Sequence, residues 1–153
     1  MTLLIIPDEW LVHDLKGNNG EKAQREAHSF LEKVRVRCDR LVILEGSPFV
    51  SKVYKLLFRD ARPHVRLISR FFSCGFLHNS EKCIKLTDVK GLPANLQDMV
   101  PCEDRYLFEI RETLEKGVIV TTDQSLMSLP EVKLRDDFLE KYNEASGLAS
   151  KDG

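Results

Sequence analysis

The sequence lacks most of the short motifs that identify a chemistry by themselves. It contains no Gly-x-Gly-x-x-Gly fingerprint, no phosphate-binding Walker loop, and no Ser, His and Asp spacing that indicates a catalytic triad. The four cysteines form no Cys-x-x-Cys pair, which argues against a thiolate zinc site and favours free, buried thiols in a reducing cytoplasm. The four histidines share no ligand spacing, so we expect them to pack or to lie on the surface.

Excess charge and long apolar runs are also missing. The 153 residues carry a net charge of −1, so composition alone favours neither a nucleic-acid binder nor a membrane-surface protein. The apolar start, residues 3–6, has no basic leader and is interrupted by Pro7, so we expect neither a signal peptide nor a membrane span. Because no repeat or linker divides the chain, we expect one domain over residues 1–145 and a flexible C-terminal tail over residues 146–153.

What the sequence does contain is an alternation of short apolar runs with amphipathic segments. The apolar runs predict buried strands at 2–6, 41–44 and 118–120 and a short edge strand at 131–134. The alternating residues 82–86 fit either a short strand or an extended connector. Helical spacing predicts helices at 21–40, 48–58, from 65 to about 75, and 103–116, and a last one from residue 136. Gly117 is expected to end its helix in a left-handed conformation. The alternation predicts a Rossmann-like, three-layer α/β/α sandwich with a mainly parallel central sheet of four to five strands.

Acidic residues stand at the ends of the predicted strands. Asp8, Glu45 and Asp123 each follow an apolar strand, and Asp104 opens the helix before the last of these strands. Because parallel strands end at one edge of a sheet, roughly 5 Å apart, we expect the four carboxylates to converge on one cleft. Oxygen ligands suit Mg²⁺ or Mn²⁺, and such an ion can activate water and steady the leaving oxygen of a phosphodiester.

Each acid also has a purely structural interpretation. Asp8 fits a turn after Pro7, and Glu45 fits a solvent-facing strand end. Asp104 fits the positive end of a helix dipole, and Asp123 fits a cap of the short helix that follows it. The metal-site prediction therefore depends on all of them reaching the same edge of the sheet.

These features resemble the PIN-domain family of small nucleases. As in that family, the first strand runs into an aspartate, Asp8, and the distal half has an acid opening a helix, Asp104, a helix-ending glycine, Gly117, and a strand running into Thr-x-Asp at residues 121–123. The resemblance implies a PIN-like fold and a metal-dependent endoribonuclease that hydrolyses RNA phosphodiester bonds. Asp8, Asp104 and Asp123 would hold Mg²⁺ or Mn²⁺, with Glu45 as a fourth catalytic acid. A protein partner such as an antitoxin, and a homodimer, are further expectations.

A basic stretch between residues 52 and 70 is a second candidate site. Lys52, Lys55, Arg59 and Arg62 are expected to guide an RNA backbone, and a solvated helix face is the alternative. Trp10 is expected to pack at the rim of the sheet, with base stacking as the alternative.

Two other functions stay open. The PIN family's second acid lies inside the helix after the second strand, near Lys52 in this chain, where no acid is present. This departure motivates the alternative of a catalytically degraded PIN-like module that binds RNA or a protein partner. A receiver-type small-molecule domain also fits the strand pattern, although the lysine that such a domain needs cannot be placed.

Overall fold

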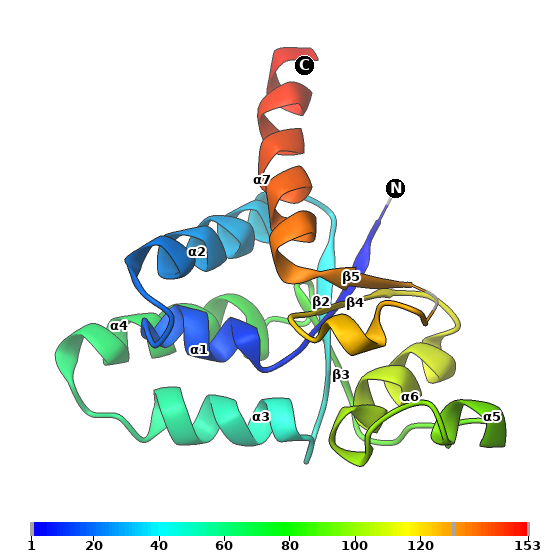
Figure 1. Ribbon diagram of the computed structural model, residues 1–153. Coiled ribbons are helices and arrows are strands. Elements are labelled where there is room, and N and C mark those ends of the chain that lie inside the picture. Colours follow the sequence, from blue (N-terminus) through cyan, green and yellow to red (C-terminus); the bar gives the residue numbers. More distant parts are fainter. Residues whose placement is uncertain (1, 130, 153) are drawn as a thin grey trace.

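A five-stranded, all-parallel sheet forms the centre of the computed structural model, which describes residues 2–129 and 131–152 and the side chains up to residue 144 (Figure 1). The strands follow the order β3-β2-β1-β4-β5. Their bounds are β1 Leu4–Pro7, β2 Arg40–Leu44, β3 Cys83–Leu86, β4 Val118–Thr121 and β5 Val132–Leu134. The four predicted strands are present, with the short last one at an edge, and Cys83–Leu86 form a strand and not a connector.

The innermost strand is β1, which pairs with β2 on one side and with β4 on the other. Every residue of β1 and of β4 is buried, as expected for apolar runs that are covered on both faces. Ile6 pairs with Ile119 and Pro7 with Val120. Because Pro7 has no N–H to donate, it closes the strand and leaves Asp8 at the carboxyl edge of the sheet.

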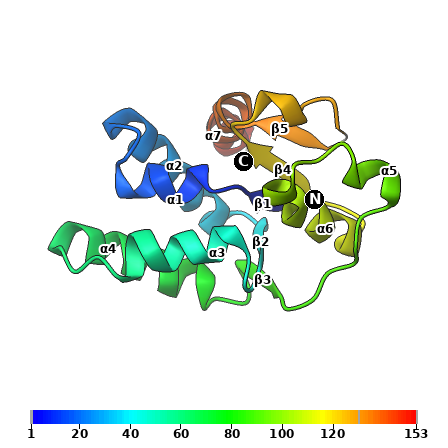
Figure 2. The same cartoon turned by 60° about the horizontal axis from the view of Figure 1, so that its bottom comes forward.

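Helices cover both faces of the sheet and complete the predicted three-layer sandwich (Figures 1 and 2). α6 (Arg105–Leu114) packs on β1, β2 and β4 at one face, whereas α1 (Trp10–Lys16), α2 (Glu21–Val36) and α7 (Arg135–Asp152) lie at the other. The remaining helical segments are α3 Pro48–Lys52, the π-helical η1 Val53–Phe58, α4 Pro63–Phe72, the π-helical η2 Ser73–Leu77, α5 Ala94–Gln97, and the 3₁₀ turns η3 Cys102–Asp104 and η4 Gln124–Leu126.

Two predicted helix ends are wrong. The helix predicted for 21–40 ends at Val36, because Arg37 turns extended and Lys82, on a distant segment, donates to the carbonyls of Val34 and Arg37. Glu115, not Gly117, takes the left-handed conformation after α6, with φ at 59°. Gly117 has φ at 120° and leads into β4, where an added Cβ would come within 3.1 Å of the Ile6 side chain.

The prediction of buried cysteines holds for Cys83 alone. Burial raises the pKa of this thiol to about 12, so it acts as a small apolar side chain. Cys38, Cys74 and Cys102 are exposed, and Cys38 lies beyond the end of α2 and not on its buried face.

Two further expectations concern a membrane span and a flexible C-terminal tail. None of the helices within the described residues has the length and apolar character needed to cross a membrane. The predicted flexible tail, 146–153, stays a prediction: α7 extends to Asp152, and the side chains of the tail lie outside the described ones.

Candidate active site

The order of the strands reverses between β1 and β4. From β1 the chain adds β2 and β3 on one side, then crosses to add β4 and β5 on the other. This is the order of the doubly wound Rossmann folds, and it differs from the 2-1-3-4-5 order of receiver domains. Ligands of such sheets bind outside the carboxyl ends of the strands at the reversal point. Asp8 follows β1 and Asp123 follows β4 shortly after its last residue, so both acids flank this point.

Asp8 is held in place by three hydrogen bonds. Its Oδ1 accepts from the Glu9 amide at 2.7 Å and from the Tyr106 hydroxyl at 3.3 Å, and its Oδ2 accepts from the Thr121 hydroxyl at 2.9 Å. Tyr106 comes from the first turn of α6 and Thr121 from the end of β4, so two elements distant in the sequence fix one carboxylate together with the adjacent amide. The turn interpretation of Asp8 therefore accounts for only one of its contacts.

Thr121 connects the two acids across the reversal point. Its side chain is fully buried, donates to Asp8 and accepts from the Asp123 amide at 3.1 Å. The Asp123 carboxylate accepts from the amide and the hydroxyl of Ser125, at 2.9 and 2.6 Å. Asp123 therefore caps η4, as its structural interpretation predicts, while its backbone is tied to the same threonine as Asp8.

Asp104 completes the cluster from the N-terminal end of α6. The pKa of its carboxyl is raised to about 6, first by partial burial and then by the charges of Asp8, Asp123, Glu103 and Glu9, in that order. Tyr106 responds to the same field: burial, and then the charges of Asp8 and Glu9, raise the pKa of its hydroxyl far above the usual range. Burial and the neighbouring charges thus make ionisation of Asp104 costly.

Glu45 does not join this cluster. It is exposed after β2, and it is absent from the charges that raise the pKa of Asp104. β2 lies on the side of β1 away from β4, so its carboxyl end is outside the reversal point. Glu9 is near Asp104 instead, and the sequence signal that could have revealed it is its position directly after Asp8. Tyr106, which follows Asp104 closely in α6, was also missed.

The donor set has the chemistry of a hard-cation site. Asp8, Asp104 and Asp123 offer only oxygen ligands, which suit Mg²⁺ and Mn²⁺. Within residues 2–129 and 131–144, however, no three His, Cys, Asp or Glu side chains are already placed to hold one ion. The hydrogen bonds of Asp123 to Ser125 show one reason, because they turn its carboxylate toward η4. Ion binding would therefore require a side-chain rotation.

Trp10 packs at the rim of the sheet as expected, and its ring is not open for a base to stack on. It is buried, and its indole N–H donates to the Val120 carbonyl at 2.7 Å. This bond ties the start of α1 to the end of β4 and so supports the position of Asp8 between them.

The predicted RNA-binding residues divide into two groups. Arg62 forms a two-pronged ion pair with Asp60, with a shortest distance of 2.6 Å, and Lys16 contacts the same carboxylate at 3.3 Å. These cations hold the pKa of Asp60 well below its usual range. Lys52, Lys55 and Arg59 make no ion pair within the described part of the chain, so their charges are available to a ligand.

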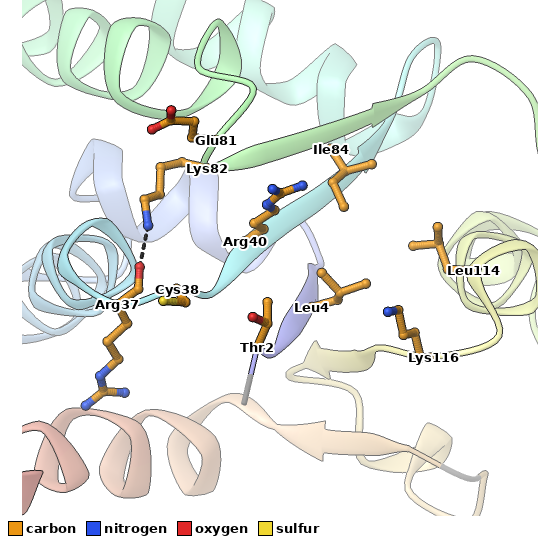
Figure 3. A pocket seen from close by; sticks show the side chains of 10 residues that line it. All are labelled: Thr2, Leu4, Arg37, Cys38, Arg40, Glu81, Lys82, Ile84, Leu114 and Lys116. Atoms are coloured by element: carbon orange, nitrogen blue, oxygen red, sulfur yellow. Dashed lines mark hydrogen bonds between the residues drawn. The ribbon is translucent and has the colours of Figure 1, made fainter.

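A further hollow lies at the opposite, amino edge of the sheet (Figure 3). It has a volume of about 610 Å³ and is lined by cations, but two of them already have structural roles. Lys82 binds the last carbonyls of α2, and the Arg37 guanidinium points away from the hollow and stacks on Tyr142. Only Arg40 and Lys116 remain, so this hollow carries no functional argument.

Comparison of the chain with protein-family models, with curated proteins and with solved structures gives no match. The PIN resemblance therefore rests on the residues described above.

Proposed function

We propose that the chain is a metal-dependent endoribonuclease that hydrolyses RNA phosphodiester bonds. The observation that supports this best is the position of Asp8, Asp104 and Asp123 around the reversal point of the sheet, where burial and then the charges of the other two acids raise the pKa of Asp104. Repelling carboxylates at a ligand-binding edge are expected where a cation is to be bound.

The roles follow from the contacts of each residue. Asp8, Asp104 and Asp123 would hold Mg²⁺ or Mn²⁺, which supplies an activated water and stabilises the charge of the leaving oxygen. Tyr106 and Thr121 position Asp8, because each donates to one of its carboxylate oxygens. Because burial and the neighbouring acids raise the pKa of Asp104 to about 6, this carboxyl would give up any bound proton on binding a cation. Lys52, Lys55 and Arg59 guide the phosphate backbone.

The second candidate is a catalytically degraded module that binds RNA or a protein partner. Two observations favour it: no group of three acids in the described residues is already arranged for an ion, and Glu45 lies outside the cluster. In this case RNA or partner binding would be insensitive to chelators, and no turnover would be found.

Cleavage of a labelled single-stranded RNA by the purified chain in Mn²⁺ tests the proposal. We expect turnover that EDTA abolishes, and we expect Asp8→Asn and Asp123→Asn to lose it while retaining wild-type circular dichroism. Asp98→Asn is the matched control, because it removes one exposed carboxylate of the nearby loop and should cleave normally. Wild-type-level cleavage by both site variants would refute the nuclease. RNA binding without any turnover would favour the degraded module.

A further inference from the structure

A helical projection extends from the acid-bearing edge of the sheet (Figure 2). α3 begins directly after β2, where the Ser47 hydroxyl accepts from the Val50 amide and caps the helix as predicted. η1 continues this helix with a wider turn, in which the Arg59 amide donates to the Tyr54 carbonyl, five residues back, at 3.0 Å. The wider turn places Arg59 one turn beyond Tyr54 on the same face, which an ordinary α-turn would not do.

Tyr54 stands between two hollows on this projection. The first, of about 550 Å³, begins at Ser47 beside the end of β2 and includes Lys55 and Arg59. The second, of about 480 Å³, lies between η1 and α4 and includes Arg66 and Arg70. Tyr54 lines both, so it separates two adjacent cavities along one surface.

The charge of this surface is positive on both sides of Tyr54. Among the residues that the structure describes, none of Lys55, Arg59, Arg66 and Arg70 forms an ion pair. The acid at the second hollow, Asp60, is already neutralised by Arg62 and Lys16. Among the residues that line the two hollows, an anionic ligand would therefore meet cations with no competing carboxylate.

The ring of Tyr54 is fixed and partly open. Phe58 packs against it at right angles, with the ring centroids 4.9 Å apart, while 47% of the Tyr54 surface stays exposed. An open aromatic ring flanked by cations is the arrangement on which single-stranded nucleic acids stack their bases, because every base has an aromatic face. A protein ligand would not need cations on both sides of the ring.

We propose that Tyr54 is a base-stacking platform on a track for single-stranded RNA. Lys55 and Arg59 bind phosphates on the side of the acid cluster, and Arg66 and Arg70 bind them beyond the ring. The choice of RNA rests on the proposed function. An unpaired strand is required, because a duplex buries the faces of its bases. Since the first hollow begins beside β2, the neighbour of β1, the track leads toward Asp8.

Binding of a fluorescein-labelled ten-nucleotide oligouridine, followed by anisotropy in EDTA, tests the platform without any cleavage. We expect Tyr54→Ala to weaken binding roughly 5- to 150-fold and Tyr54→Phe to bind like the wild type, because stacking needs the ring and not the hydroxyl. Arg59→Gln should lower the slope of log affinity against log salt by about 0.7, the value for one phosphate contact on a single strand. Arg25→Gln is the matched control and should leave the slope unchanged, because Arg25 lies on α2 and lines neither hollow.

Several outcomes would overturn the platform. They are wild-type affinity for Tyr54→Ala, equal losses for Tyr54→Ala and Tyr54→Phe, or equally tight binding of the same sequence in a duplex. A protein that co-purifies with the wild type but not with Tyr54→Ala, while RNA affinity is unchanged, would assign the surface to a protein partner instead. The two proposals fail separately: a chain that binds RNA through Tyr54 without cleaving it refutes only the nuclease, and a nuclease unaffected by Tyr54→Ala refutes only the platform.

Discussion

Replacing Asp104 by asparagine is expected to stabilise the folded chain at neutral pH. The pKa of Asp104 is raised from 3.8 to about 6, first by burial and then by the neighbouring acids. The folded state therefore binds the Asp104 proton more tightly than the unfolded state does. Between these two values the free energy of unfolding falls as the pH rises, and above a pH of about 6 the full cost of the ionised group is present.

The size of the effect follows from the shift. A pKa difference of one corresponds to about 1.4 kcal/mol, so the shift sets an upper limit of about 3 kcal/mol. Asp104 is half-exposed, and solvent screens its repulsion from the other acids. The charge also gains a little from the N-terminal end of α6, which asparagine would lose. We therefore expect Asp104→Asn to raise the free energy of unfolding by about 1–2 kcal/mol at pH 7.5.

Urea unfolding of wild type and variant in EDTA, at several pH values from 4 to 7.5, measures this difference. The gain from Asp104→Asn should be close to zero at pH 4 and should grow through pH 6. Asp98→Asn, on the exposed segment before η3, is the control for loss of one negative charge and should follow the wild type. In Mn²⁺ the stability advantage of Asp104→Asn over the wild type should shrink or reverse, because an ion that binds only the folded cluster stabilises the wild type more than the variant.

Parallel pH profiles for wild type and Asp104→Asn would refute the reasoning. They would mean that Asp104 is not strained by its neighbours, and the raised pKa would then no longer support a cation site at this edge.

Two further predictions concern the framework of the fold. Arg135 is buried and contacts Asp14 at 2.8 Å, so Arg135→Met should leave the Asp14 charge buried without its main partner and cost about 3–5 kcal/mol in urea unfolding. Asp136→Ala removes the exposed partner of Arg135 and should lower the free energy of unfolding by less than about 1 kcal/mol. Equal losses for Arg135→Met and Asp136→Ala would contradict the role of Asp14 as the main partner. Gly117→Ala should lower the free energy of unfolding by more than about 1 kcal/mol in the same assay. The positive φ of Gly117 disfavours a side chain, and the new Cβ would press on Ile6. An unchanged urea midpoint would show that the backbone adapts.

The fold class could be predicted because its signals are local. Apolar runs such as 118–120 need cover on both faces, and helices between them imply parallel crossovers. Strand order has no comparable signal, since it depends on which runs meet in space. The end of α2 depends on Lys82, which is far away in the sequence, so periodicity alone placed it too late. The π-turn of η1 is likewise invisible in a pattern that fits an ordinary helix.

The candidate site could likewise be predicted only as far as local signals reach. Asp8 and Asp123 stand at strand ends, and the rule for parallel sheets brings such ends to one edge. Glu45 satisfies the same local rule, and only the strand order separates it from the other acids. Tyr106 carries no motif, and its bond to Asp8 appears only once α6 is packed on the sheet.

The proposed metal site and the proposed RNA track place opposite charges along one edge of the molecule. A phosphate strand that follows the cations beside Tyr54 toward Asp8 would meet repelling carboxylates in the absence of a cation. A divalent ion held by these acids would reverse that repulsion, because it would attract the phosphate and offset the charge on Asp104. A module that only binds RNA gains nothing from this cluster. The acids at the reversal point are therefore easier to reconcile with metal-dependent cleavage than with RNA binding alone.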